Sequence, residues 1–467
     1  MVFNRRIYSF LLLALFLSIP LAGLCGCATL PSVSEMIDTV PVTEEPPQIA
    51  SAEGLLSPEE SRVLMERLTE KSEYADTLQR HIAVMESISG SRLISGNKVA
   101  LLIDGAATYA SMFEAIRNAS DHINMETFTL EDDAIGRRFA ELLLQKQADG
   151  VQVNLIYDSA GSFRTPASFF QHLRDGGIRV VQYNPLNPLA DNRKWMLFHR
   201  DHRKLLIVDG RVAVTGGVNI NANYCNGPPA VSAEGGIRLP WRDTDVRIEG
   251  PAVAEFQKLF IETWKRQKGP ELLDHDYFPN LRTEGSAMVQ VVGSTQGQLN
   301  RLTFVLYVSA VTFAGKAVHM TNAYFVPDNQ ILTALRNAAH RGVDVRIVLP
   351  KVSRHPLALY AGQYYYSDLL RAGVKLYERN NAILHAKTAV IDGVWSTVGS
   401  TNMDFQSLLR NDEVNTVILD REFAADMEKM YASDIAESDR IDWSEWKNRP
   451  LWPRIREWFA HLLTRWL

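Results

Sequence analysis

An internal repeat between about residues 92 and 435 constrains the fold more than any other feature of the sequence. Each copy predicts, in order, a strand, a helix, a second strand, a helix that ends in glycine, and a third strand. Strands that alternate with helices at these lengths indicate α/β units with a largely parallel sheet. We therefore predict two tandem α/β domains, each with a sheet core flanked by helices, related by a pseudo-twofold axis. The corresponding spans are 123–129, 135–147, 151–157 and 173–181 in the first copy, and 317–325, 331–340, 343–349 and 369–377 in the second.

Both copies contain the pattern HxKx4D at a corresponding place. The first match is HRKLLIVDG at 202–210, and the second is HAKTAVIDG at 385–393. Two matches in the same register of a repeat leave little room for chance. The correspondence also continues beyond the motifs, at 14, 15 and 17 residues after the histidines, with Gly216 and Gly399, Gly217 and Ser400, and Asn219 and Asn402.

The residues around each motif predict a hairpin. The stretch after each lysine is strand-like, and an Asp-Gly pair such as 209–210 is typical of a two-residue turn. Side chains two apart on a strand share a face, so each histidine points the same way as its lysine. If the two copies pack face to face, two imidazoles and two ammonium groups meet in one pocket. We predict a single active site at the domain interface, formed by His202, Lys204, His385 and Lys387.

These residue types suit chemistry at a phosphodiester. The lysines, with Asn219 and Asn402, can donate to phosphate oxygens, which gain negative charge in the transition state. One neutral histidine can attack phosphorus to form a phosphohistidine, while its protonated partner gives a proton to the leaving alkoxide and then takes one from the acceptor. This scheme requires no metal and no other cofactor. Asp209 and Asp392 complete the two catalytic motifs, and we interpret them as turn formers that brace the hairpins more than as direct participants.

The paired HxKx4D motifs, followed by GGxN and GSxN, resemble the phospholipase D superfamily. Within it, the segments NMETFTLEDD (124–133), DSAGS (158–162), RDHRK (200–204) and WRDTDVRIEGP (241–251) are similar to bacterial cardiolipin synthases. The resemblance covers about residues 92–435. It implies a phosphatidyltransferase that joins two phosphatidylglycerols into cardiolipin and releases glycerol. It also implies His202 as nucleophile and His385 as general acid/base, two roles that could be exchanged.

The resemblance further implies a carboxylate beside each histidine. A carboxylate on the far ring nitrogen fixes the tautomer and stabilises the imidazolium. Glu413, within NDEVN, is the candidate partner of His385, and Asp243, within WRDTD, is the candidate partner of His202. Glu413 follows its histidine by 28 residues and Asp243 follows its own by 41, so these assignments rest on the family more than on the register of the repeat.

Three other functions stay open. With water as the acceptor, the protein would be a phospholipase D that yields phosphatidic acid. A superfamily nuclease would use the same site, but the formal net charge of −5 and the lack of aromatic and basic clustering beyond the motifs argue against a nucleic-acid partner. A non-catalytic envelope scaffold would leave both His-Lys pairs unexplained. The expected partners are a phospholipid substrate and a membrane surface.

The N-terminus predicts export and a membrane anchor. Two arginines precede an apolar run over residues 7–24, and LCGC at 24–27 resembles a lipobox. Cleavage would leave Cys27 as the acylated residue of a lipoprotein, and the alternative is an uncleaved anchor helix. Both place the protein in the bacterial cell envelope, with the body exported under the positive-inside rule. Cys225 then remains without a disulfide partner.

Six segments are expected along the chain. They are a lipoprotein signal peptide (1–26), a proline-rich linker (27–56), a helical segment that opens with the capping box SPEE (57–91), phospholipase D-like domains at 92–268 and 285–435 with motif regions 196–223 and 379–406, and a tryptophan-rich tail (436–467). One face of a helix in the tail suits a phospholipid surface, although docking of that face on the catalytic body is an alternative. That face carries Ile455, Trp458, Phe459, Leu462, Leu463 and Trp466.

Overall fold

The structure is a computed structural model that describes residues 30–41, 45–69, 75–187, 198–225, 230–231, 237–272, 274–295 and 301–464. Residues Ser32–Leu467 form one compact unit, which contains both motifs. The expected signal peptide and Cys27 lie outside the described residues. No helix within the described ranges is long and apolar enough to cross a bilayer.

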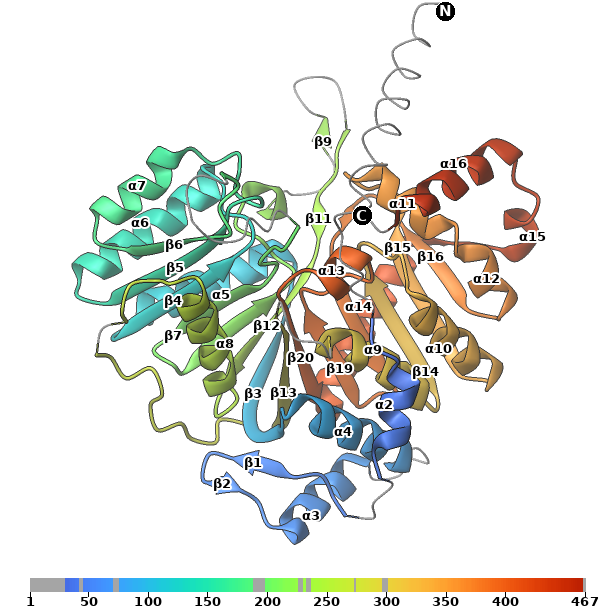
Figure 1. Ribbon diagram of the computed structural model, residues 1–467, viewed down its shortest axis with the longest axis horizontal. Coiled ribbons are helices and arrows are strands. Elements are labelled where there is room, and N and C mark those ends of the chain that lie inside the picture. Colours follow the sequence, from blue (N-terminus) through green and yellow to red (C-terminus); the bar gives the residue numbers. More distant parts are fainter. Residues whose placement is uncertain are drawn as a thin grey trace, which may run out of the picture. The chain divides into compact units, whose positions relative to one another are not determined.

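Within these ranges, each copy of the repeat contributes seven strands to one 17-stranded sheet (Figure 1). The first copy supplies β3 (Leu93–Ile103), β4 (His122–Thr127), β5 (Gln152–Asp158), β6 (Arg179–Tyr183), β7 (Lys204–Val208), β8 (Val212–Gly216) and β12 (Thr244–Glu249). The second copy supplies β13 (Ala287–Ser294), β14 (Ala317–Asn322), β15 (Asp344–Pro350), β16 (Lys375–Arg379), β18 (Lys387–Ile391), β19 (Trp395–Gly399) and β20 (Glu413–Leu419).

The two copies have the same strand order. It runs β6-β5-β4-β7-β8-β12-β3 in the first and β16-β15-β14-β18-β19-β20-β13 in the second. The first three strands of each order are parallel and the rest are antiparallel, because the motif strands form hairpins. The long strand β3 joins the copies, since Ile94 pairs with Val289 of β13 while Lys98 pairs with Glu249 of β12. The predicted α/β fold of two related halves is confirmed, and the halves share a continuous sheet. The expectation of a largely parallel sheet is wrong, because only two of the six strand pairings in each copy are parallel.

Side chains of β7 alternate between two hydrophobic cores. Leu206 and Val208 face the core of the first copy, whereas Leu205 and Ile207 face a core that includes Val390 and other residues of the second copy. This alternation follows from the two-residue period of a strand. The first core is covered by α5 (Asp104–Asn118), α6 (Ala134–Ala148) and α7 (Ala167–Asp175), and the shared core by α8 (Val253–Arg266) and α14 (Arg421–Ala436).

The remaining elements are short or lie outside the repeat. The second copy adds α9 (Leu302–Phe313), α10 (Asn329–His340), α11 (Pro356–Gln363), α12 (Tyr366–Arg371) and α13 (Phe405–Leu409), and the C-terminal region adds β21 (Ser438–Arg440), α15 (Trp443–Trp446) and α16 (Leu451–Leu462). Two small strand pairs join β9 (Ala230–Val231) to β10 (Ile237–Arg238) and β11 (Trp241–Arg242) to β17 (Ile383–Leu384), and a 3-10 helix spans Ala222–Cys225.

The stretch 27–56, expected as a tether, is folded over part of its length. Helix α2 (Val33–Thr39) buries Val33, whose N–H donates to the side chain of Gln330 at 2.8 Å. Strand β1 (Ile49–Ser51) extends the sheet beside β3 and forms a hairpin with β2 (Gly54–Leu55). This part of the chain folds because Val33 and Ile49 are buried in the body. The overall composition of the stretch, rich in proline and acidic residues, did not reveal these two apolar positions. The capping box at Ser57 then opens α3 (Pro58–Thr69), which precedes α4 (Ala75–Ser89).

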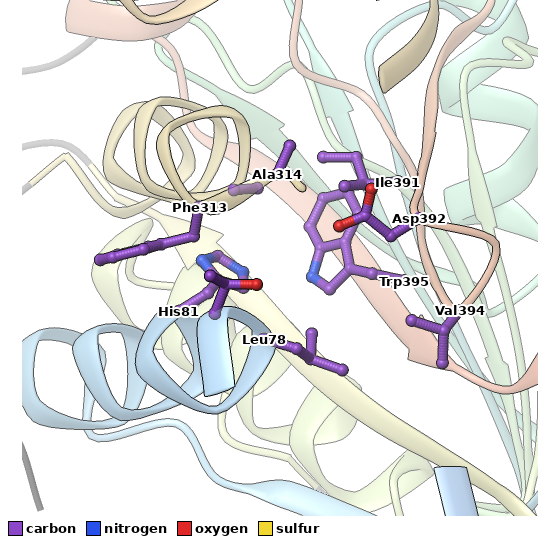
Figure 2. Close-up of a pocket in the computed structure, with 10 residues that line it drawn as sticks. Leu78, His81, Phe313, Ala314, Ile391, Asp392, Val394 and Trp395 are labelled. Atoms are coloured by element: carbon purple, nitrogen blue, oxygen red, sulfur yellow. The ribbon is translucent and has the colours of Figure 1, made fainter. Parts of the chain in front are cut away.

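A buried histidine lies where α4 packs on α9. The Nδ1 atom of His81 lies 2.9 Å from the hydroxyl of Ser309, and its ring meets that of Trp395 edge-on at 5.6 Å. Figure 2 shows both rings lining a small cavity with Phe313 and Asp392. The cavity measures about 20 Å³, which is room for one water. It is too small for a phospholipid headgroup, so it is not the candidate active site.

Burial lowers the pKa of His81 to about 3. The unfolded chain takes up a proton on this residue as the pH falls through about 6.5, whereas the folded chain does not. The free energy of unfolding should therefore decrease on acidification from pH 7 to pH 5, by about 2 kcal/mol from this residue. Denaturant unfolding of wild type and His81→Gln at both pH values measures the effect. The variant should lose less stability on acidification, and an equal loss would contradict the assignment.

Candidate active site

The first motif histidine lies where the two copies of the repeat meet. His202 precedes β7, and its backbone N–H donates to the carbonyl of Asp412 in the other copy at 2.9 Å. Its Nδ1 atom lies 3.0 and 3.1 Å from the two carboxylate oxygens of Glu413, the first residue of β20. The Ser400 hydroxyl also donates to this carboxylate, and all of these side chains are buried. A proton held on Nδ1 by the carboxylate leaves the Nε2 lone pair free to react.

The second motif histidine has equivalent surroundings, with partners that come from the first copy. The backbone N–H of His385 donates to the carbonyl of Arg242 in the first copy at 2.8 Å. Its Nδ1 atom lies 2.7 Å from a carboxylate oxygen of Asp243. The hydroxyl of Tyr224 lies 3.2 Å from the same nitrogen. Each histidine is thus positioned by backbone and carboxylate groups of the other copy.

The structure reverses the predicted pairing of histidines and carboxylates. We expected Glu413 beside His385 and Asp243 beside His202, each pair within one copy. Instead, Glu413 contacts His202 and Asp243 contacts His385. The crossed pairing makes the site composite, because each histidine finds its carboxylate partner in the opposite half of the chain.

The physical reason for the crossed pairing is the pseudo-twofold arrangement. The segment that leads into each motif runs parallel to the segment that leads into the last strand of the other copy. The residue that precedes each histidine therefore lies opposite the residue that precedes the carboxylate of the other copy. Asp201 pairs in this way with Asp412, and Leu384 with Arg242.

The two carboxylates are equivalent in the repeat, although their spacing hides it. Two residues after Asp243, Asp245 pairs with Gly216, and two residues after Glu413, Asn415 pairs with Gly399. The intervals are 29 residues from Gly216 to Asp245 and 16 from Gly399 to Asn415. Thirteen additional residues in the first copy therefore account for the difference between the spacings of 41 and 28.

The two motif lysines lie beside their histidines. The Lys204 ammonium donates to the carbonyl of His202 at 2.5 Å. The Lys387 ammonium lies 3.0 Å from Nδ1 of His385 and also donates to the carbonyl of that residue. Burial lowers the pKa of Lys204 to about 7 and that of Lys387 to about 8. The negative charge of a bound phosphodiester would raise both values and favour the ammonium forms.

The two predicted asparagines are both buried at this site, with different partners. Asn219 accepts from the N–H of Thr129 and donates to the hydroxyl of Tyr224 at 3.0 Å. The side-chain oxygen of Asn402 is buried and has no hydrogen-bond partner among the described residues. A buried amide with unused capacity is typical of a position that meets a ligand.

Aromatic side chains around the histidines are the functional residues that sequence reasoning missed. The Phe128 ring meets His202 edge-on at 5.0 Å, and the Lys204 ammonium lies 5.3 Å from its centroid. The ring centroids of Trp241 and Tyr324 lie 5.1 and 6.1 Å from that of His385. Phe128 and Trp241 stand in segments that resemble the family, whereas Tyr224 lies between Asn219 and Trp241, outside those segments, and no motif pointed to it.

Burial and contacts between the two copies shift the pKa values of the ionisable groups in the site. Burial lowers the pKa of His202, and burial together with the Lys387 ammonium lowers that of His385 to about 3. Burial alone would raise the pKa of Glu413, but His202 and Lys204 hold it below its usual value. Both imidazoles are therefore neutral at pH 7, and a phosphodiester would raise the pKa of each. Among the described residues, no cluster of three His, Cys, Asp or Glu side chains could hold a metal ion.

The motif aspartates lie at the far ends of the motif strands from the histidines. Asp209 accepts from the N–H groups of Ser120, Asp121 and His122 at 2.8 to 3.0 Å. Asp392 accepts from the N–H groups of residues 315, 316 and 317 at 2.7 to 2.9 Å. Each thereby ties its hairpin to the loop before the neighbouring strand. These contacts place both aspartates in the scaffold and outside the reacting groups.

Replacing Asp392 with alanine should destabilise the fold and spare the chemistry. The change removes three hydrogen bonds and puts alanine at a φ of 54°, so the free energy of unfolding should fall by about 2 to 4 kcal/mol. Asp392→Asn, which tolerates this backbone conformation, should lose less. Denaturant unfolding ranks the variants, and turnover per folded molecule should stay within about threefold of wild type. A large loss of turnover in a fully folded Asp392→Asn would place the residue in the reaction.

The family model described as "Cardiolipin synthase, PLD-like domain" matches residues 112–235 and 307–435, which hold both motifs and exceed half of the chain. The chain belongs to the cardiolipin synthase family of PLD-like proteins. His202, His385 and Glu413 lie inside the matched segments, and Asp243 lies eight residues beyond the first segment.

Related cardiolipin synthases cover most of the chain. That of Alkalihalophilus pseudofirmus is 34% identical over 370 residues, which are 78% of this chain and 71% of the relative. Cardiolipin synthase A of Pseudomonas putida strain GB-1 is 34% identical over 367 residues, which are 77% of this chain and 73% of the relative. The solved phosphatidylserine synthase of Haemophilus influenzae Rd KW20 shares the fold, with a TM-score of 0.59 and 12% identity over 82% of this chain and 98% of that structure.

Proposed function

We propose that the protein transfers a phosphatidyl group from one phosphatidylglycerol to a second, which forms cardiolipin and releases glycerol. The observation that carries the proposal is the reciprocal pair of buried histidines, each with a carboxylate on Nδ1, in a member of the cardiolipin synthase family. With two histidines at one site, one can bond to phosphorus while the other gives a proton to the leaving oxygen and later takes one from the acceptor.

In the first half-reaction, Nε2 of His202 attacks the phosphorus of phosphatidylglycerol. The new P–N bond forms as the P–O bond to the headgroup glycerol breaks. His385, which takes up a proton when the negative phosphodiester binds and raises its pKa, gives that proton to the departing oxygen. The phosphorylated ring becomes positive, and Glu413 stabilises it because both carboxylate oxygens lie against Nδ1. Lys204 and Lys387 offset the charge that develops on the phosphate oxygens.

In the second half-reaction, His385 acts as the base. It removes the proton from a primary hydroxyl of the second phosphatidylglycerol, whose oxygen attacks phosphorus while the P–N bond to His202 breaks. Cardiolipin leaves, and His385 again holds the proton for the next cycle. Asn219 and Asn402 are assigned as further phosphate ligands. Water in place of the second lipid would yield phosphatidic acid, which is the phospholipase D alternative.

We also assign the protein to the bacterial cell envelope, as an exported lipoprotein acylated at Cys27. The support is the pair of arginines, the apolar run over 7–24 and the sequence LCGC at 24–27. The acidic net charge of the chain gives nucleic acid no general attraction. The mass of the N-terminal peptide from membranes should show a lipid-modified Cys27, and a peptide that begins at Met1 would overturn the assignment.

Incubation of the purified protein with phosphatidylglycerol in mixed micelles tests the activity. Lipid mass spectrometry should find cardiolipin, with one free glycerol for each molecule formed. Phosphatidic acid without cardiolipin would identify a hydrolase. The absence of any lipid product would contradict the proposal, and cleavage of DNA by the same preparation would favour the nuclease alternative.

A further inference from the structure

The C-terminal helix α16 docks on the body with its polar side and turns its apolar side outward. Trp452 and Trp458 are 73% and 52% exposed, and Leu451, Ile455 and Leu462 are also exposed. The residues that α16 buries are Glu457 and Ala460. This is the reverse of the usual arrangement, in which the apolar stripe of a surface helix faces the core. Of the face drawn from the sequence, Trp466 lies outside the described residues.

Specific contacts hold α16 in this orientation. Arg449 makes two hydrogen bonds to the Glu457 carboxylate, at 2.7 and 3.0 Å. His461 stacks flat on Tyr364, the residue after α11, with ring centroids 4.0 Å apart. The Arg456 guanidinium lies 3.6 Å from the centroid of Tyr360 on α11. Figure 1 shows α11 and α16 packed side by side. The outward face is therefore fixed by the docking of the opposite face.

The chemistry of this face matches the surface of an anionic bilayer. Exposed large apolar side chains that form a patch mark an interaction site. Tryptophan prefers the headgroup level of a membrane, and basic residues beside it attract anionic lipids. Residues 447–464 contain four basic side chains and one acidic side chain, in a chain whose net charge is −5. Of the basic members, Lys447 and Arg454 are exposed, whereas Arg449 pairs with Glu457 and Arg456 lies over Tyr360.

Other occupants fit this face less well. The described part of the body leaves this face exposed, because α16 docks through its opposite side. A helix of 12 residues is about 18 Å long, and its single face is small beside the roughly 800 Å² that each partner buries in a stable dimer. A bilayer needs no matching protein surface, and it is where the phospholipid substrates of this family reside.

A short series of contacts connects this face to the candidate active site. His355 caps the start of α11, and its ring meets that of Tyr324 at 5.7 Å. Tyr324 in turn meets the catalytic His385 at 6.1 Å. Arg354 lies 4.9 Å from the centroid of Trp241, which also neighbours His385. Helix α11 therefore lies between α16, which carries the exposed tryptophans, and the aromatic residues around His385.

We propose that the outward face of α16 docks the body of the protein on an anionic phospholipid bilayer and thereby presents the active site to its lipid substrates. The inference deepens and rests on the proposed function, because it names the physical form in which the substrate is met. It predicts that α16 serves substrate presentation and not the chemical step, so changes in this face should alter KM for lipid in bilayers and leave kcat unchanged.

The first test locates α16 at the bilayer without reference to activity. The full chain carries a polarity-sensitive fluorophore at Ile455→Cys in a Cys225→Ser background and is reconstituted in vesicles of phosphatidylcholine with or without phosphatidylglycerol. The matched control carries the label at Phe278→Cys, another exposed apolar position, so any label on Cys25 or Cys27 contributes equally. We expect a blue shift at position 455 alone, stronger with phosphatidylglycerol. No shift, or a shift that depends on protein concentration without lipid, would overturn the proposal.

The second test separates docking from chemistry. Trp452→Ser combined with Trp458→Ser should raise KM for phosphatidylglycerol in vesicles at least fivefold. It should leave turnover of short-chain phosphatidylglycerol, dissolved below its micelle concentration, within twofold of wild type. Equal KM values for the variant and the wild type on vesicles would contradict the docking role. If neither protein acts on any phosphatidylglycerol, the proposed function fails, and the fluorescence result still decides whether α16 binds the bilayer.

Discussion

Replacing His202 with alanine should reduce cardiolipin formation by roughly 10⁴-fold or more. The imidazole is the group that forms the bond to phosphorus, and its loss removes a covalent route that the remaining phosphate ligands cannot replace. Lys204, Lys387 and the asparagines would still bind the phosphate, so affinity for phosphatidylglycerol should change far less than turnover. The measurement is the initial rate of cardiolipin and glycerol release, with binding followed separately.

His385→Ala should be impaired to a similar extent, because neither the departing glycerol nor the incoming hydroxyl would exchange its proton. The matched control is His172→Ala on α7, an exposed histidine that should keep wild-type turnover. All three variants should unfold at denaturant concentrations close to that of wild type. Retention of more than about a tenth of the activity in either motif variant would contradict a reaction that uses both histidines.

Replacing Glu413 with glutamine should lower turnover by about 10² to 10⁴-fold. The amide has nearly the shape of the carboxylate, but it cannot stabilise the positive ring of a phosphorylated His202 and permits the wrong tautomer. Asp243→Asn should act on His385 in the same way. The crossed contacts make the spectroscopic outcome specific, since each carboxylate reports on the histidine of the opposite copy.

Imidazole NMR signals test that crossing. With the signals of His202 and His385 assigned from their alanine variants, Glu413→Gln should move the signals of His202 and leave those of His385 nearly unchanged, and Asp243→Asn should do the opposite. Glu413→Gln combined with His202→Ala should be no slower than His202→Ala alone, because the two residues act as a unit. Movement of the His385 signals in Glu413→Gln would restore the pairing within each copy.

The sequence was sufficient for the repeat, the two hairpins and the convergence of the motifs. Strand and helix periodicity carry that information locally, and the Asp-Gly turns mark where each motif strand ends. The antiparallel half of each sheet was less visible, because periodicity does not state which strands pair. The joining of both halves through β3 depends on pairings with β12 and β13, which are distant in the chain.

The partners of the histidines could not be predicted, for a physical reason. Glu413 and Asp243 are both close in sequence to the motif of their own copy, and only the packing of one copy on the other shows that each meets the opposite histidine. The direction in which α16 faces was equally hidden. An apolar stripe with two tryptophans fits both a membrane and a protein core, and only the burial of Glu457 and Ala460 against the body shows that the stripe faces outward.

Identification of the covalent intermediate tests the central claim most directly. The protein is mixed with phosphatidylglycerol, quenched within milliseconds under conditions that preserve phosphohistidine, digested, and analysed by peptide mass spectrometry. We predict a phosphatidyl adduct on the peptide that contains His202, absent from His202→Ala, whereas an adduct on His385 would reverse the roles of the two histidines. Turnover of phosphatidylglycerol to cardiolipin with no adduct on either histidine would contradict transfer through this composite site.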